Sequence, residues 1–118
     1  MENITINKGM IDRLRGRNYY NSIIKLMEED KRVCYLTCDG LTEGSAIRAM
    51  RDKHPYRVID VGIAEQNLIG VSAGLALGGK IPFVESLSSF LTLRAMDQIH
   101  ADIAINNLRV RLLGTNNG

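Results

Sequence analysis

A glutamate that follows a short apolar run is the residue of this chain with the clearest chemical potential. The run 58–61 has the character of a buried strand, and Gly62 marks the turn after it. From Ala64 onward, apolar residues recur at spacings of three and four, which predicts a helix. Glu65 therefore lies where a strand gives way to a helix, the edge at which parallel α/β sheets bind ligands. A carboxylate there can share a proton with a ligand. The alternative is a plain first-turn residue that the helix dipole favours.

The rest of the pattern alternates between strand and helix, which predicts an α/β fold. Apolar periodicity and turn residues predict strands at 33–37, 58–61, 82–86 and 109–114, and helices at 18–29, 43–53, 64–77 and 88–104. Parallel strands need crossover connections of this length, so we expect a parallel sheet with helices on both faces.

Composition narrows the class of protein. The 118 residues are 45% hydrophobic and 24% charged, which is ordinary for one globular domain. The net charge of +2 gives no reason to expect nucleic acid as a partner, and no apolar stretch is long enough to cross a bilayer. The first residues lack a signal peptide pattern. Cys34 and Cys38 fit a reduced cytoplasmic protein better than a disulfide framework.

Two other kinds of site are disfavoured. The run 74–80 has the letters of a phosphate-binding P-loop, but Ile81 replaces the magnesium-binding Ser or Thr, and a helix rather than a strand precedes the run. His54 and His100 have no Cys or Asp at ligand spacing, so we expect no metal site.

The chain resembles the pyrimidine-binding domain of transketolase and its thiamine-diphosphate-dependent relatives. Separate blocks appear in the family's order: GIAEQN, then AGLALGGKIPF, then a helix with F-x-x-x-R-A-x-D-Q-I, and a final strand in NNLRVRLLGT. The likeness is clear from residue 57 onward and looser before it. It implies the thiamine-diphosphate-binding (pyrimidine) fold over a single domain, 1–118, that is truncated at its C-terminal end, where the family continues with further elements.

The resemblance also implies roles for two residues at the cofactor. Glu65 matches the catalytic glutamate that hydrogen-bonds a pyrimidine nitrogen of thiamine diphosphate, which favours the imino tautomer that removes the thiazolium C2 proton. Phe90 matches the aromatic residue that stacks on the aminopyrimidine ring, although helical periodicity alone also permits a core phenylalanine. Leu87 and Leu93 flank it where many relatives carry aromatics. Arg94 and Asp97, three residues apart, suggest an ion pair or an interface anchor rather than catalysts.

Three further matches concern the cofactor and substrate. Asp39 resembles the cofactor-binding aspartate of the family's A-D-L-T loop, with Gly40 as an extra residue. Arg17, placed ahead of the first expected helix, matches an arginine that contacts the sugar phosphate, or it belongs to a solvated basic run with Arg13 and Arg15. Asn116 stands where many transketolases have a substrate-binding histidine, so ordinary sugar-phosphate recognition is in doubt.

The resemblance implies half of an active site. The family holds the cofactor's diphosphate and magnesium on another domain with a G-D-G motif, which this sequence lacks. We therefore expect a transketolase-like transferase that is inactive alone. It would transfer two-carbon ketol units between sugar phosphates in a homo- or hetero-oligomer with a diphosphate-binding domain or subunit. The alternatives are a deoxyxylulose phosphate synthase-like fragment and a non-catalytic interaction module that keeps the fold.

Overall fold

The computed structural model describes the backbone of residues 8–39 and 46–116, and the side chains of residues 19–39 and 46–116. Its elements follow the chain in this order: α1 (Lys8–Glu29), β1 (Val33–Thr37), α2 (Ala46–Lys53), β2 (Val58–Asp60), α3 (Glu65–Leu77), β3 (Ile81–Leu87), α4 (Ser88–Leu93), α5 (Met96–Gln98), the π-helical turn η1 (Ile99–Ala104) and β4 (Arg111–Thr115). The strands form one parallel sheet in the order β2-β1-β3-β4.

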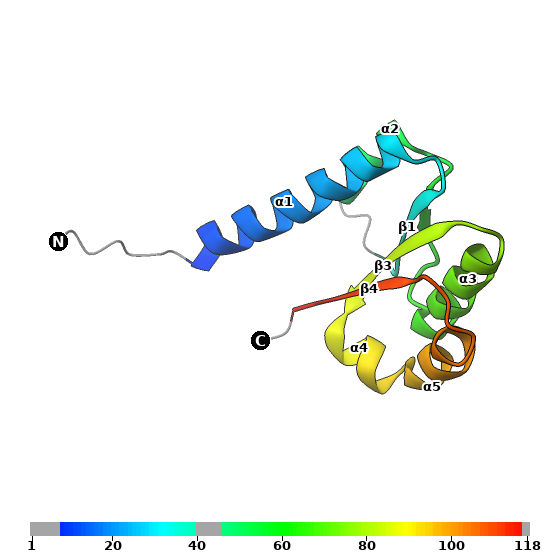
Figure 1. Cartoon of the computed structure of the whole chain (residues 1–118). Coiled ribbons are helices and arrows are strands. Elements are labelled where there is room, and N and C mark those ends of the chain that lie inside the picture. The colour runs from blue at the N-terminus through cyan, green and yellow to red at the C-terminus, as the bar shows by residue number, and fades with distance from the viewer. Residues whose placement is uncertain (1–7, 40–45, 117–118) are drawn as a thin grey trace.

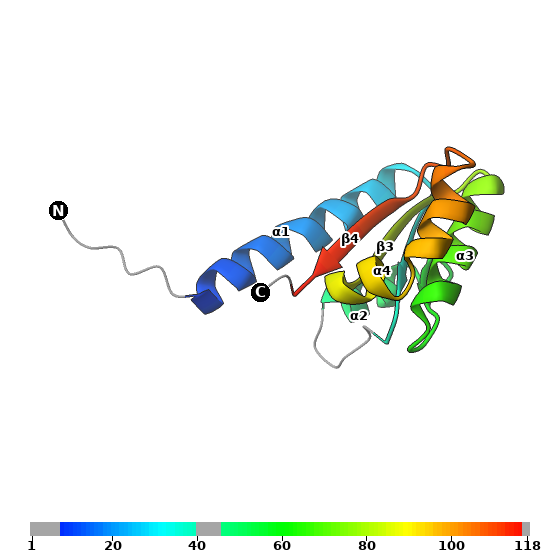
Figure 2. The same ribbon diagram turned by 90° about the horizontal axis from the view of Figure 1, so that it is seen from below.

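The sheet separates two apolar layers, because successive side chains of a strand point to opposite faces. On one face, Tyr35 and Val58 pack with residues of α1 and α2, including the fully buried Met27 and Met50. The other face packs against α3, α4 and η1. Figure 2 shows β3 and β4 between α1 on one side and α4 on the other. The N-terminal half of α1 projects away from the sheet (Figure 1). The predicted α/β fold with a parallel sheet and helices on both faces is confirmed.

Two helix predictions need correction. The first helix begins at Lys8 rather than residue 18, so Arg17 lies inside α1 and not ahead of it. The helix predicted at 88–104 is broken after Leu93. Ala95 leaves helical geometry with φ −116° and ψ 12°, and it is completely buried in the core. The amide of Ala95 donates to the carbonyl of Phe90, five residues back, so the chain turns inward at this point.

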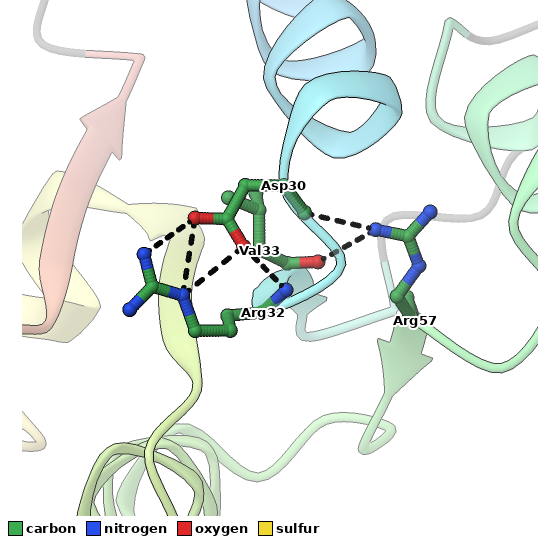
Figure 3. A network of polar contacts seen from close by, with 4 residues as sticks. All are labelled: Asp30, Arg32, Val33 and Arg57. Carbon is green, nitrogen blue, oxygen red and sulfur yellow. Dashed lines mark hydrogen bonds and ion pairs between the residues drawn. The ribbon is translucent and has the colours of Figure 1, made fainter.

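The end of the sheet opposite Glu65 is tied together by Arg57. The Arg57 guanidinium donates to the carbonyl oxygens of Met27, Asp30 and Val33 at 2.8, 3.3 and 3.3 Å. Figure 3 shows this guanidinium beside Asp30, whose carboxylate is held by Arg32. The Arg32 hydrogen bonds lower the pKa of Asp30 to about 2. Through these contacts, Arg57 holds the residue before β2 against the end of α1 and the start of β1. The amino ends of β1 and β2 are thereby fixed relative to each other.

Candidate active site

The turn before Glu65 is held by the carboxylate of Asp60. Asp60 Oδ1 accepts hydrogen bonds from the amides of Gly62 at 2.9 Å and Asp39 at 2.8 Å. Gly62 has φ 73°, a left-handed conformation that favours glycine. The amide of Ala64 then donates to the Gly62 carbonyl at 2.8 Å. Asp60 therefore connects the loops after β1 and β2. It thereby fixes the turn that precedes Glu65, the first residue of α3.

Glu65 is a buried carboxylate with a partner that is half exposed. Only 3% of Glu65 is accessible to solvent, whereas 48% of the Arg94 side chain is exposed. Arg94 Nη1 donates to Glu65 Oε2 at 2.8 Å. The same guanidinium lies over the ring of Phe90, with its Cζ 4.0 Å from the ring centroid. The structure thus joins Glu65 and Phe90 through a single arginine, and the ion pair of Arg94 is with Glu65 rather than with its sequence neighbour Asp97.

Cys38, which directly follows β1, feels the charge of Glu65 and forms a hydrogen bond with Ser86 of β3. Burial raises the pKa of the Cys38 thiol, and the charges of Glu65 and Asp60 raise it further, while hydrogen bonds with Ala64 and Ser86 lower it. Ser86 itself is only 8% exposed. A thiol whose pKa is raised is a weak nucleophile, so this setting does not activate Cys38.

The remaining predicted residues lie at the same edge or outside the described side chains. Asp39 and Asn116 are both exposed, with φ of 52° and 54°. Asn116 directly follows β4, and Asp39 is the second residue after β1. In the described ranges, no hydrogen bond or ion pair joins Asn116 to Glu65 or Phe90. The Arg17 side chain lies outside the described residues, so its predicted contact with a sugar phosphate stays a prediction.

Sequence reasoning missed a second buried carboxylate, on the opposite face of the sheet. Glu85 of β3 is 8% exposed and accepts a hydrogen bond from Tyr20 Oη at 2.7 Å and another from Tyr35 Oη. Burial and the charge of Glu85 raise the pKa of Tyr19 to about 12. Burial, the hydrogen bond that each ring donates to Glu85 and the charge of Glu85 raise the pKa of Tyr20 and Tyr35 above their usual range. A charged residue between two buried strand neighbours was the available signal.

Three further features concern the residues that the structure describes: metal-binding groups, membrane spans and the state of the cysteines. Among the described side chains, those of residues 19–39 and 46–116, no group of three or more His, Cys, Asp and Glu is arranged to hold a metal ion. In the described backbone, residues 8–39 and 46–116, no helix has both the length and the apolar character of a membrane span. Cys34 and Cys38 are free thiols.

Known proteins with similar sequences are transketolase-type enzymes. The chain is 38% identical over 100 residues to a 6-deoxy-6-sulfo-D-fructose transketolase subunit from a Clostridium species, a match that covers 85% of this chain and 31% of the relative. It is 37% identical over 111 residues to the 1-deoxy-D-xylulose-5-phosphate synthase of Clostridium perfringens, covering 91% of this chain and 18% of that enzyme. The chain thus spans about a third or less of these relatives.

A solved structure and a family description agree with these relatives. A split-gene transketolase, described as an inactive β4 tetramer, superposes with a TM-score of 0.75 at 33% identity, over 81% of this chain and 32% of that one. Residues 17–118 match the family described as transketolase, pyrimidine binding domain. Since that match covers most of the chain and includes Glu65, Phe90 and Arg94, the chain belongs to the transketolase pyrimidine-binding domain family.

Proposed function

We propose that this chain is the pyrimidine-binding part of a thiamine-diphosphate-dependent transketolase that moves two-carbon ketol units between sugar phosphates. The observation that supports this proposal most strongly is the buried carboxylate of Glu65, which Arg94 joins to the ring of Phe90. When bound, thiamine diphosphate supplies an electron sink for breaking a carbon–carbon bond of a ketose. A flat aromatic side chain and a desolvated carboxylate suit its aminopyrimidine end, which is a flat heterocycle with basic ring nitrogens.

The proposed work of this chain's residues is to orient a ring and to share a proton with it. Glu65 would hold a proton between its carboxylate and a ring nitrogen, in a setting where only 3% of the residue meets water. Phe90 would fix the plane of the ring by stacking. Asp60 keeps the turn before Glu65 in place through its two amide hydrogen bonds, so the carboxylate is oriented before a ligand arrives.

The finer assignments rest on position at the sheet edge. We assign Asp39 to the cofactor, and Arg17 and Asn116 to the sugar phosphate, because Asp39 and Asn116 follow strands at the edge that carries Glu65 and Arg17 matches a family position. We also place the protein in the cytoplasm, where the thiols of Cys34 and Cys38 stay reduced.

The diphosphate and magnesium of the cofactor are assigned to a second domain or subunit. Support comes from the relatives: one is named a transketolase subunit, and another is a split-gene transketolase in a β4 tetramer called inactive. A second candidate activity is 1-deoxy-D-xylulose-5-phosphate synthesis, because such a synthase matches 91% of this chain. Product analysis of the completed enzyme separates the two, since only the synthase yields a 1-deoxy sugar phosphate.

Calorimetry tests the division of the site between two chains. Thiamine diphosphate with magnesium is titrated into this chain alone, into a candidate diphosphate-binding subunit alone, and into their mixture. We expect tight binding in the mixture only, and weaker binding in the mixture with the Glu65→Gln variant. A Glu29→Gln variant is the matched control, because Glu29 is an exposed glutamate on α1. Tight, magnesium-dependent binding by this chain alone would refute the half-site assignment.

A further inference from the structure

The Arg94 side chain contacts both residues, Glu65 and Phe90, that the proposed function assigns to binding the pyrimidine ring. The Arg94 guanidinium donates to Glu65 Oε2 at 2.8 Å and lies over the Phe90 ring at 4.0 Å from its centroid. The guanidinium therefore covers one face of the Phe90 ring while it is bound to Glu65. A ring that stacked on that face and reached the carboxylate would need the volume that Arg94 fills.

The chemistry of the guanidinium explains why it suits this place. It is flat, delocalised and positively charged, with N–H donors along its edge, and it stacks on aromatic faces. An aminopyrimidine that shares a proton at a ring nitrogen offers the same features: a flat π-face and an edge N–H directed at a carboxylate. An isolated buried carboxylate is unfavourable, so Glu65 gains from a cationic partner while no ligand is present.

The position of Arg94 lets the side chain move while the backbone stays fixed. Arg94 caps the end of α4, and its amide and that of Ala95 both donate to the carbonyl of Phe90, at 3.0 and 3.1 Å. Ala95 is completely buried, which anchors the backbone on the far side. The Arg94 side chain is 48% exposed, so its guanidinium can turn outward and regain water without disturbing the core.

We propose that Arg94 is a built-in placeholder for the aminopyrimidine ring. This inference rests on the proposed function and adds to it. In the ligand-free chain, the guanidinium covers the Phe90 ring and keeps the Glu65 carboxylate paired. A flat heterocycle with an edge N–H displaces it, because only such a group replaces both of its contacts. Arg94 thereby lowers the affinity for the ring and discriminates against ligands that offer only one of the two contacts.

Titration of the full chain with the ring alone tests this inference. The probe is 4-amino-2,5-dimethylpyrimidine, and the readout is the Nε–Hε resonance of Arg94 in 15N NMR together with the backbone amide shifts. We expect the probe to move the Arg94 resonance toward the position of an exposed arginine. We also expect Arg94→Ala to bind the probe about three to ten times more tightly, the size of a lost ion pair plus a lost cation–π contact.

Two further variants complete the design. Arg94→Lys keeps the charge but not the flat stacking group, so its affinity for the probe should lie between those of the parent and Arg94→Ala. Arg109→Ala changes an exposed arginine just before β4 and should bind as the parent does. Thermal unfolding establishes that each variant is folded.

The outcomes separate this inference from the proposed function. If Glu65→Gln abolishes probe binding while Arg94→Ala binds equally or more weakly, Arg94 is not a placeholder, and the proposed function stands. If the parent and Arg94→Ala bind the probe regardless of Glu65, the placeholder and the pyrimidine site are both wrong. If neither binds the probe while the completed enzyme still binds thiamine diphosphate in a Glu65-dependent way, the placeholder is wrong and the proposed function stands.

Discussion

Two glutamates in the described part of the chain are buried on different sides of one sheet, and their partners differ in kind. Glu65, at the carboxyl edge, is paired with an arginine whose side chain is 48% exposed. Glu85, in the α1-facing layer, accepts hydrogen bonds from two tyrosine hydroxyls, one of which belongs to the fully buried Tyr35. The two carboxylates are similarly inaccessible, at 3% and 8%, so burial alone does not distinguish a functional residue from a structural one.

We expect the two glutamates to differ in whether the side chain that pairs with the carboxylate can move away from it. The Arg94 side chain is 48% exposed, and in our proposal it turns into solvent and leaves the Glu65 carboxylate to a ligand. Tyr35 cannot leave without opening the core, because it packs between α1, α2 and the sheet. Glu85 and its phenols therefore act as a fixed polar cluster that stabilises the fold. We expect the Glu85 cluster to govern stability and the Glu65 pair to govern ligand binding.

The largest expected effect on stability comes from Glu85→Ala. Removing the carboxylate leaves the hydroxyls of Tyr20 and Tyr35 without their acceptor and opens a cavity, so we expect a loss of about 3 kcal/mol or more. Urea denaturation of the full chain measures it. The triple variant Glu85→Leu, Tyr20→Phe and Tyr35→Phe should regain part of the loss, because both sides of the cluster are then apolar. A loss below that of a typical surface substitution would contradict the structural role.

The two tyrosines should contribute unequally. Tyr35→Phe leaves one oxygen of a buried carboxylate without its donor and should cost about 2 kcal/mol. Tyr20→Phe should cost about 1 kcal/mol, because Tyr20 is only partly buried and water can replace its hydroxyl. The same urea experiment gives both values. Equal costs would show that the difference in burial between the rings does not matter.

The smallest effect is a loss of stability at alkaline pH. Because the pKa of Tyr19 is raised from 10.0 to about 12 in the folded chain, the unfolded chain loses its tyrosine protons first. The contribution of Tyr19 to the free energy of unfolding is therefore fully present below pH 10 and is lost as the pH rises from 10 to 12. After allowing for the exposure of this ring, we expect the loss to be about 1 kcal/mol. Tyr20 and Tyr35 act in the same direction. Urea midpoints against pH should decline less steeply in Tyr35→Phe. The same decline of the urea midpoint with pH in Tyr35→Phe as in the parent would show that Tyr35 does not contribute to the alkaline loss of stability.

Local patterns were sufficient to predict most of the fold. The strand predicted at 33–37 has the same bounds in the structure, and the helix predicted at 64–77 begins one residue later. Both are strongly patterned segments with clear turn residues beside them. The break after Leu93 could not be predicted in this way, since it depends on Ala95 packing into a core built from distant elements.

The partners of the site residues were harder to predict than the residues themselves. Motif and position point to Glu65 and Phe90 as site residues, whereas for Arg94 the sequence suggests an ion pair with its neighbour Asp97 or an interface anchor. Its partner Glu65 is 29 residues away, and the hydroxyls that bind Glu85 are 50 and 65 residues from it. Periodicity reports which face a residue occupies and carries no information about which distant side chain meets it there.

The most direct test compares Glu65→Gln with Glu85→Gln in the enzyme completed by its diphosphate-binding partner. The measurement is the rate at which the C2 proton of bound thiamine diphosphate exchanges with deuterated solvent. The account predicts that Glu65→Gln slows exchange about tenfold or more, the usual size of an acid–base contribution, and keeps the melting temperature. Glu85→Gln should lower the melting temperature and keep the exchange rate. Parental exchange in Glu65→Gln would contradict the central claim, and Glu65 would then be only the first residue of a helix.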